Sequence, residues 1–90
     1  MLINKLLVEF IGTMFFLYII MATNNAYAIG AALTVAILIG GNISGGMYNP
    51  AVSMMMVVAG KLPVSQFIPY VAAQLFGGLV ALELSKRIKI

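Results

Sequence analysis

Three long apolar segments occupy most of this 90-residue sequence and limit its fold more than any other feature. They run from about residue 6 to 23, from about 27 to 41 and from about 65 to 85. A helix of about 20 residues crosses the hydrocarbon core of a bilayer. The sequence is 63% hydrophobic and 8% charged, whereas soluble domains are about 45–50% apolar and about 25% charged. It therefore predicts one all-α, multi-pass integral membrane unit over residues 1–90, with the lipid bilayer as its main partner.

The polar residues exclude several classes of function. The sequence has no Cys, His or Trp, and Glu9 and Glu83 are its only carboxylate side chains. Thiol chemistry, His-based acid–base catalysis and most metal sites need residues that are missing here. Five Lys and Arg residues are also too few for a nucleic-acid interface. We expect no enzyme, cofactor, metal or nucleic-acid partner.

Between the second and third apolar segments lies a glycine-rich loop followed by a short apolar stretch, at about residues 42–59. This stretch is too short to cross a bilayer, yet it is too apolar for an ordinary exposed loop. Non-helical backbone at membrane depth is tolerated only where it is buried in protein or lines a water-filled cavity. The segment predicts a re-entrant loop and half-helix. The alternative is a surface loop followed by an interfacial helix.

The half-helix begins at Asn49-Pro50-Ala51. Asn is a favoured N-cap, and Pro suits the first helical position because its missing N–H is not needed there. These preferences alone explain the motif without any function. If the loop enters the membrane, however, the positive end of the helix dipole lies near the midplane, and the Asn49 amide can donate to a hydroxyl or water. Such a donor suits a small neutral solute.

The loop before this motif consists of Gly45, Gly46, Met47 and Tyr48. The two glycines keep side chains out of the path, and the backbone carbonyls of the four residues are candidate acceptors along it. Small residues also recur every four positions on two of the expected spans, which favours close helix packing. They are Ala28, Ala32, Ala36 and Gly40 on the second span, and Ala73, Gly77 and Ala81 on the third.

Three motifs together resemble the aquaporin, or major intrinsic protein, family. The run from Ile43 to Ser53, ISGGMYNPAVS, is similar to the family's signature loop, I-S-G-G/A-H-x-N-P-A-V-T. Glu9-x-x-Gly12-Thr13-x-Phe15 resembles its first-helix motif, and Tyr70-x-x-Ala73-Gln74-x-x-Gly77-Gly78 its third-helix motif. The motifs occur in the family's order and cover nearly the whole chain. The resemblance implies three transmembrane helices plus one re-entrant half-helix.

The resemblance also implies roles for individual residues. Asn49 is the central donor to the permeant molecule, and Pro50 and Ala51 shape the meeting point of two half-helices. Glu9 holds the loop backbone by hydrogen bonds, and Gln74 braces the loop in the same way. A buried acid needs such partners; the alternative is that Glu9 lies near the interface.

Four further positions are compared with the family pattern. Ile29 falls at the selectivity constriction, where aromatic residues are usual, and Val52 matches the position of the constriction arginine. Met47 replaces the usual His, which alters the lining of one vestibule, and Ser53 replaces Thr. The resemblance implies a channel for water or small neutral solutes such as glycerol. For a homodimer, which has two copies of Ile29 and no constriction arginine, these departures predict looser selectivity.

The resemblance covers only the first of the family's two inverted repeats, with one NPA motif. One hypothesis is an antiparallel homodimer that restores the second half. A second hypothesis is a heteromer with a second half-channel chain. The alternative class is a truncated, non-conducting membrane protein that interacts with full-length channels; a small lytic pore former is a weaker fourth possibility.

The charges at the two ends bear on orientation. Three spans place the termini on opposite sides of the membrane. Lys5 and Lys61 then lie on one side, and Lys86, Arg87 and Lys89 on the other. Two charges against three give no strong positive-inside preference. The balance is compatible with insertion in both orientations, which an antiparallel pair requires.

Overall fold

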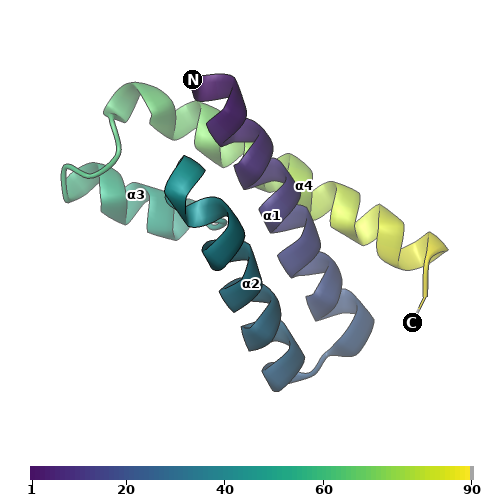
Figure 1. The fold of residues 1–90 in the computed structure, drawn as a ribbon. Coiled ribbons are helices and arrows are strands. Elements are labelled where there is room, and N and C mark those ends of the chain that lie inside the picture. Colours follow the sequence, from purple (N-terminus) through teal and green to yellow (C-terminus); the bar gives the residue numbers. More distant parts are fainter. Residues whose placement is uncertain (90) are drawn as a thin grey trace.

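The computed structural model describes residues 1–89 and is all-α, as the sequence predicts (Figure 1). Its elements, in chain order, are α1 (Leu2–Thr23), α2 (Ala26–Ser44), α3 (Pro50–Val58), the 3-10 turn η1 (Val64–Gln66) and α4 (Phe67–Arg87). Three segments of 22, 19 and 24 residues are long and apolar enough to cross a membrane. They are α1, α2 and the continuous segment Val64–Arg87. The chain is therefore a multi-pass integral membrane protein with one additional short helix.

Helix α1 is the centre of the fold, and it packs against both α2 and α4. Figure 1 shows α1 and α4 running in the same general direction and α2 running against them, so that the termini lie at opposite ends. A tight turn joins α1 to α2. Asn24 takes the left-handed conformation at the end of α1, and the Asn25 side chain caps α2 by accepting from the Ala28 N–H at 3.0 Å.

The sequence suggests that the second span ends near residue 41, but helix α2 continues to Ser44. Residues 40–44 are weak helix formers, but tertiary contacts outweigh this preference. Gly40 is buried, and a Cβ atom at this position would overlap the Tyr48 hydroxyl and lie 2.6 Å from a methyl of Val8. Glycine at this point therefore makes a close contact with the loop that an ordinary side chain would block. The helix stops at Gly45, whose φ of 93° is left-handed.

The other boundaries also differ slightly from the expected ones. Helix α1 begins at Leu2 rather than near residue 6, so its first turn includes the polar residues Asn4 and Lys5. The last span starts with the 3-10 turn after Pro63, and α4 continues to Arg87 rather than ending near residue 85. Its last turns carry exposed ion pairs from Glu83 to Lys86 and Arg87, at 3.4 and 3.6 Å.

The small residues lie in the helix contacts. Ala32, Ala36, Gly40, Gly77 and Ala81 are all buried, whereas Ala28 and Ala73 are only half-buried. Gly77 allows a close approach between α4 and α1, since a Cβ atom there would lie 2.7 Å from the backbone oxygen of Phe10. Large apolar side chains such as Leu38 and Ile39 point outward, each 74% exposed. Small residues at the helix contacts and large apolar residues on the outside suit a chain that is surrounded by lipid.

Candidate functional site

The loop between α2 and α3 folds back along α2. Gly45 and Gly46 have φ values of 93° and 64°, which residues other than glycine rarely adopt. Gly46 passes so close to α2 that a Cβ atom on it would lie 3.4 Å from the Gly41 Cα and 3.5 Å from the Ile37 Cα. Tyr48 also has a positive φ, 54°. This reversal brings the start of α3 beside the middle of the helix bundle.

Glu9 of α1 holds this loop. Its side chain is fully buried, and each carboxylate oxygen accepts two hydrogen bonds. Oε2 accepts from the Ser44 hydroxyl at 2.6 Å and from the Met47 N–H at 3.1 Å. Oε1 accepts from the Tyr48 N–H at 2.8 Å and from Gln74 Nε2 at 2.9 Å. All four groups donate, so the two oxygens of this buried side chain are satisfied from α2, the loop and α4.

Gln74 extends this network from α4 to α3. Its Nε2 donates to Glu9 and also to Ser53 Oγ at 2.8 Å, and the Ser53 hydroxyl donates to the Asn49 carbonyl at 3.1 Å. Glu9, Ser53 and Gln74 are each at most 2% exposed. The structure thus brings together the two residues that the sequence singles out as loop-bracing, and joins α1, the loop, α3 and α4 through their side chains.

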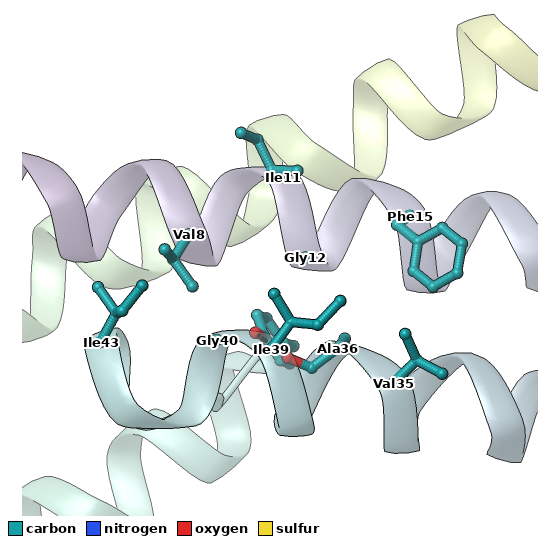
Figure 2. Close-up of a pocket in the computed structure, with 10 residues that line it drawn as sticks. Val8, Ile11, Gly12, Phe15, Val35, Ala36, Ile39, Gly40 and Ile43 are labelled. Atoms are coloured by element: carbon teal, nitrogen blue, oxygen red, sulfur yellow. Dashed lines mark hydrogen bonds between the residues drawn. The ribbon is translucent and has the colours of Figure 1, made fainter.

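The ring of Tyr48 fills a gap between α1 and α2. Cβ atoms at Gly12 and Gly40 would overlap this side chain, so the two glycines make room for it. Figure 2 shows Gly12 of α1 facing Gly40 and Ala36 of α2 across this gap. The Tyr48 hydroxyl donates to the Ala36 carbonyl at 2.6 Å. The loop is therefore tied to α2 as well as to α1.

Removing the Tyr48 hydroxyl tests whether its hydrogen bond to the Ala36 carbonyl stabilises the fold. Tyr48→Phe keeps the ring but loses one buried hydrogen bond, so we expect the free energy of unfolding in detergent micelles to fall by about 1 kcal/mol. Tyr18→Phe is the matched control, because its hydroxyl donates to the Ile88 carbonyl in an exposed setting. Equal effects of the two variants would show that the buried hydrogen bond of Tyr48 contributes no more than the exposed one of Tyr18.

Asn49 presents its amide nitrogen at the start of α3. Its Oδ1 caps the helix by accepting from the Ala51 N–H at 2.7 Å, and Pro50 occupies the first helical turn. No hydrogen bond within residues 1–89 uses the Asn49 side-chain nitrogen, and the residue is exposed. Asn49 and Pro50 line a cavity together with Thr13, which lies at the middle of α1. The structure thus puts a free donor at the mid-length of a spanning helix.

The loop carbonyls and side chains differ in their surroundings. Within residues 1–89, the carbonyls of Gly45, Gly46, Met47 and Tyr48 accept no hydrogen bond. The Met47 side chain is buried in a core cluster with Leu62 and Tyr70. The vestibule position that the resemblance implies for this residue stays a prediction.

The two expected constriction residues lie at different distances from Asn49 along the chain: Val52 is three residues after it, whereas Ile29 is on α2. Val52 is in the first turn of α3, where it packs against the cluster of Met47, Leu62 and Tyr70. Ile29 is half-buried in the first turns of α2. It precedes Ala36, the contact of Tyr48 on α2, by about two helical turns, or roughly 10 Å along the axis.

Ser44 and Tyr70 belong to the site although the sequence analysis assigns them no role. The Tyr70 hydroxyl donates to the Ser44 carbonyl at 2.7 Å, and the Ser44 hydroxyl also accepts from the Gly46 N–H at 3.1 Å. Tyr70 is four residues before Gln74 and therefore on the same helix face. This spacing is a signal that could have identified Tyr70.

Comparison with known proteins identifies the family. The sequence profile described as Major intrinsic protein matches residues 1–89. Aquaporin-8 of Mus musculus is 39% identical over 95 residues, covering 93% of this chain and 36% of that protein. Aquaporin Z of Brucella melitensis is also 39% identical over 95 residues, covering 88% of this chain and 41% of that protein.

A third relative is named for glycerol uptake rather than as an aquaporin. The Glycerol uptake facilitator protein-like 6 of Lactiplantibacillus plantarum is 34% identical over 87 residues, covering 87% of this chain and 40% of that protein. No solved structure gives a significant match. The chain spans less than half the length of these three relatives. Members of this family are channels rather than enzymes, which agrees with the exclusion of catalysis drawn from the composition. The chain belongs to the major intrinsic protein family and has the fold of one half of an aquaporin.

Proposed function

We propose that the chain forms one half of a membrane channel for water or small neutral solutes, completed by a second, oppositely oriented copy. The observation that carries the proposal is the free Asn49 amide at the start of α3, beside the middle of α1. A helix N-terminus at this depth repels cations and presents donors to an uncharged hydroxyl or water. The buried Glu9 network supports the proposal because it holds the start of α3 in place.

The loop backbone supplies the other half of this chemistry. The four carbonyls of residues 45–48 have no acceptor role within residues 1–89, so they are candidate acceptors for a permeant molecule. A water or alcohol molecule both donates and accepts, so alternating contacts with these carbonyls and with the Asn49 amide suit it. Ions gain little from one amide donor in place of a full hydration shell.

The names of the relatives support this solute class. Two carry the name aquaporin, and one is named a glycerol uptake facilitator-like protein. We infer from these names and from the single amide donor that the permeant is water or a small polyol such as glycerol.

An antiparallel homodimer agrees with the features of this chain. Three spans put the two ends of the chain on opposite sides, so an inverted copy supplies the reversed repeat. Lys5 and Lys61 on one side are nearly balanced by Lys86, Arg87 and Lys89 on the other. A weak charge bias allows both orientations in the same membrane.

Asn49→Asp tests the pore directly. The carboxylate still caps α3 but replaces the amide donor with a negative acceptor, so we expect osmotic water or glycerol flux into vesicles to fall about tenfold or more. Asn25→Asp is the matched control, because Asn25 caps α2 in the same way in the turn between two spans. Stopped-flow light scattering of vesicles containing each chain measures the flux.

The outcome separates the candidate functions. Flux that is present in the wild-type chain and in Asn25→Asp, and lost in Asn49→Asp, supports the channel. Vesicles that shrink no faster than empty ones favour the non-conducting alternative, and flux that appears only with a second half-channel chain favours the heteromer.

Because the sequence has no Cys, Lys89→Cys gives a single labelling site. An impermeant thiol reagent should label about half of the molecules if both orientations are present.

A further inference from the structure

An apolar groove of about 470 Å³, the α1–α2 groove, runs between the first two helices. Its α1 wall extends from Val8 to Phe15 and its α2 wall from Val35 to Ile43, and Figure 2 shows the two walls facing each other. The ring of Tyr48 fills the gap between the helices and forms the floor. The Tyr48 hydroxyl already donates to a backbone carbonyl of α2. The groove therefore suits an apolar occupant.

The α1–α2 groove covers only one half of the membrane span. Val8 and Phe15 are seven positions apart, which is about 10 Å along the helix axis, and Phe15 is near the middle of the 22-residue α1. Half of the hydrocarbon core is about 15 Å thick. A lipid tail has this extent, because it reaches from the membrane surface to the midplane. A spanning helix of a second copy would instead need a contact along the whole thickness.

Polar side chains lie at the outer end of the α1–α2 groove. Asn4 and Lys5 precede Val8 by four and three residues, so they extend the same face of α1 by one turn. Asn42 follows Ile39 by three residues and extends the α2 wall in the same way. Within residues 1–89, these three polar side chains take part in no hydrogen bond or ion pair. The groove thus has an apolar interior and a polar, cationic end.

The charges around this end favour a negative partner. Glu9 and Glu83 are the only carboxylate side chains in the sequence. Glu9, one turn after Lys5, is buried and accepts from four donors of the loop network. Glu83 is in the last turns of α4, which ends far from the start of α1 (Figure 1). A lysine near the end of a spanning helix extends toward the membrane surface, where lipid phosphates lie.

We propose that the α1–α2 groove binds one acyl chain of an anionic phospholipid, and that Lys5, Asn4 and Asn42 hold its headgroup. Hydrocarbon surrounds the acyl chain in the bilayer as well as in the groove, so burial of the chain gives little preference. The preference among lipids comes from the headgroup, whose phosphate accepts from the ammonium and from the amides. One lysine near the membrane surface gives about a fivefold preference for an anionic over a zwitterionic lipid. The lipid site does not depend on the proposed channel function.

Quenching of tryptophan fluorescence by brominated lipids tests the lipid site. Because the sequence has no Trp, Phe15→Trp gives a single reporter at the inner end of the α1–α2 groove. The vesicles contain equal amounts of phosphatidylglycerol and phosphatidylcholine, and only one of the two lipids carries bromine on its acyl chains. We expect phosphatidylglycerol to occupy the groove about five times as often as phosphatidylcholine. Leu38→Trp is the control reporter, since Leu38 is 74% exposed on α2 and does not line the groove; both lipids should quench it nearly equally.

Charge variants of the Phe15→Trp chain locate the headgroup. Lys5→Gln should abolish the preference for phosphatidylglycerol, whereas Lys5→Arg should keep it. Asn42→Asp adds a negative charge at the same end of the groove, on an exposed residue, and should lower the preference as well. Lys61→Gln also removes one positive charge, but from the loop between α3 and η1, which does not line the groove. It should leave the preference unchanged.

Several results would overturn the lipid site. An equal preference at Leu38→Trp would show that the anionic lipid is attracted to the whole surface rather than to the groove. A preference that survives both Lys5→Gln and Asn42→Asp would place the headgroup elsewhere. The absence of quenching at Phe15→Trp by either lipid would show that protein, such as a second copy, covers the groove. None of these results bears on the channel function, because osmotic flux is measured separately.

Discussion

Replacing Glu9 with glutamine should destabilise the folded chain more than any other conservative change. The two oxygens of Glu9 face four donors, two on each oxygen. A glutamine side chain keeps one oxygen but turns an NH₂ group toward two of these donors, whichever way the amide is oriented. The Ser44 hydroxyl and the Gln74 amide can reorient to accept from the new NH₂ group, but either the Met47 or the Tyr48 backbone N–H loses its acceptor. The hydrogen bonds to a neutral amide are also weaker than those to a carboxylate, so we expect a loss of roughly 3–5 kcal/mol in the free energy of unfolding.

Glu83→Gln is the matched control for this variant. Glu83 is exposed and pairs only with Lys86 and Arg87 at the end of α4, and exposed pairs contribute little. Denaturant titration in detergent micelles, followed by circular dichroism, measures both variants. If Glu9→Gln is as stable as Glu83→Gln, the Glu9 network does not hold the loop. If Glu9→Gln still folds in part, we expect its vesicle flux to be lost, because the start of α3 is no longer held in place.

Gly77→Ala should have the second largest effect, because it pushes two spanning helices apart. The added Cβ would lie 2.7 Å from the Phe10 backbone oxygen and 3.2 Å from the Met14 backbone nitrogen. Backbone atoms in the middle of α1 cannot move without shifting the helix, so the contact between α1 and α4 must open. Overpacking of this kind costs about 1–3 kcal/mol, and the shift also strains the Gln74–Glu9 hydrogen bond, which joins the same helices.

Gly30→Ala is the matched control for the helix contact. It lies within α2, and nothing is within 4 Å of the position that its Cβ would occupy. Alanine has the higher helix propensity, so Gly30→Ala should be neutral or stabilising. The same titration in micelles compares the two variants. A Gly77→Ala chain that is as stable as Gly30→Ala would show that the close approach of α1 and α4 is not required.

Much of the architecture could be predicted from the sequence because the membrane restricts the options. Long apolar runs with few charges must be helices that satisfy their own backbone hydrogen bonds. Glu9 and Gln74 could be singled out because a polar side chain inside an apolar span needs a polar partner. The end of α2 could not be placed correctly, since local propensity disfavours helix through Gly40 and Gly41, while contacts with Tyr48 and Val8 favour it.

Other features depend on contacts between distant residues. The sequence does not indicate that Met47 packs with Leu62 and Tyr70, because these residues are 15 or more positions away in the chain. Nor does it indicate that the Tyr48 ring enters the gap left by Gly12 and Gly40. These packing relations arise only when α1, α2 and the loop are assembled.

The sequence by itself determined the all-α membrane class, the three spans, the capped start at Asn49-Pro50 and the family. Each of these follows from local chemistry: hydropathy over the length of a bilayer, cap and proline preferences, and motifs whose residues are close in the chain. Only the tertiary structure decided which donors share the Glu9 carboxylate and that Thr13 and Gln74 keep unpaired oxygens in the wall residues of one cavity. The physical reason is that a buried polar atom is satisfied, or left unpaired, by groups from other helices, and their positions depend on how the helices pack.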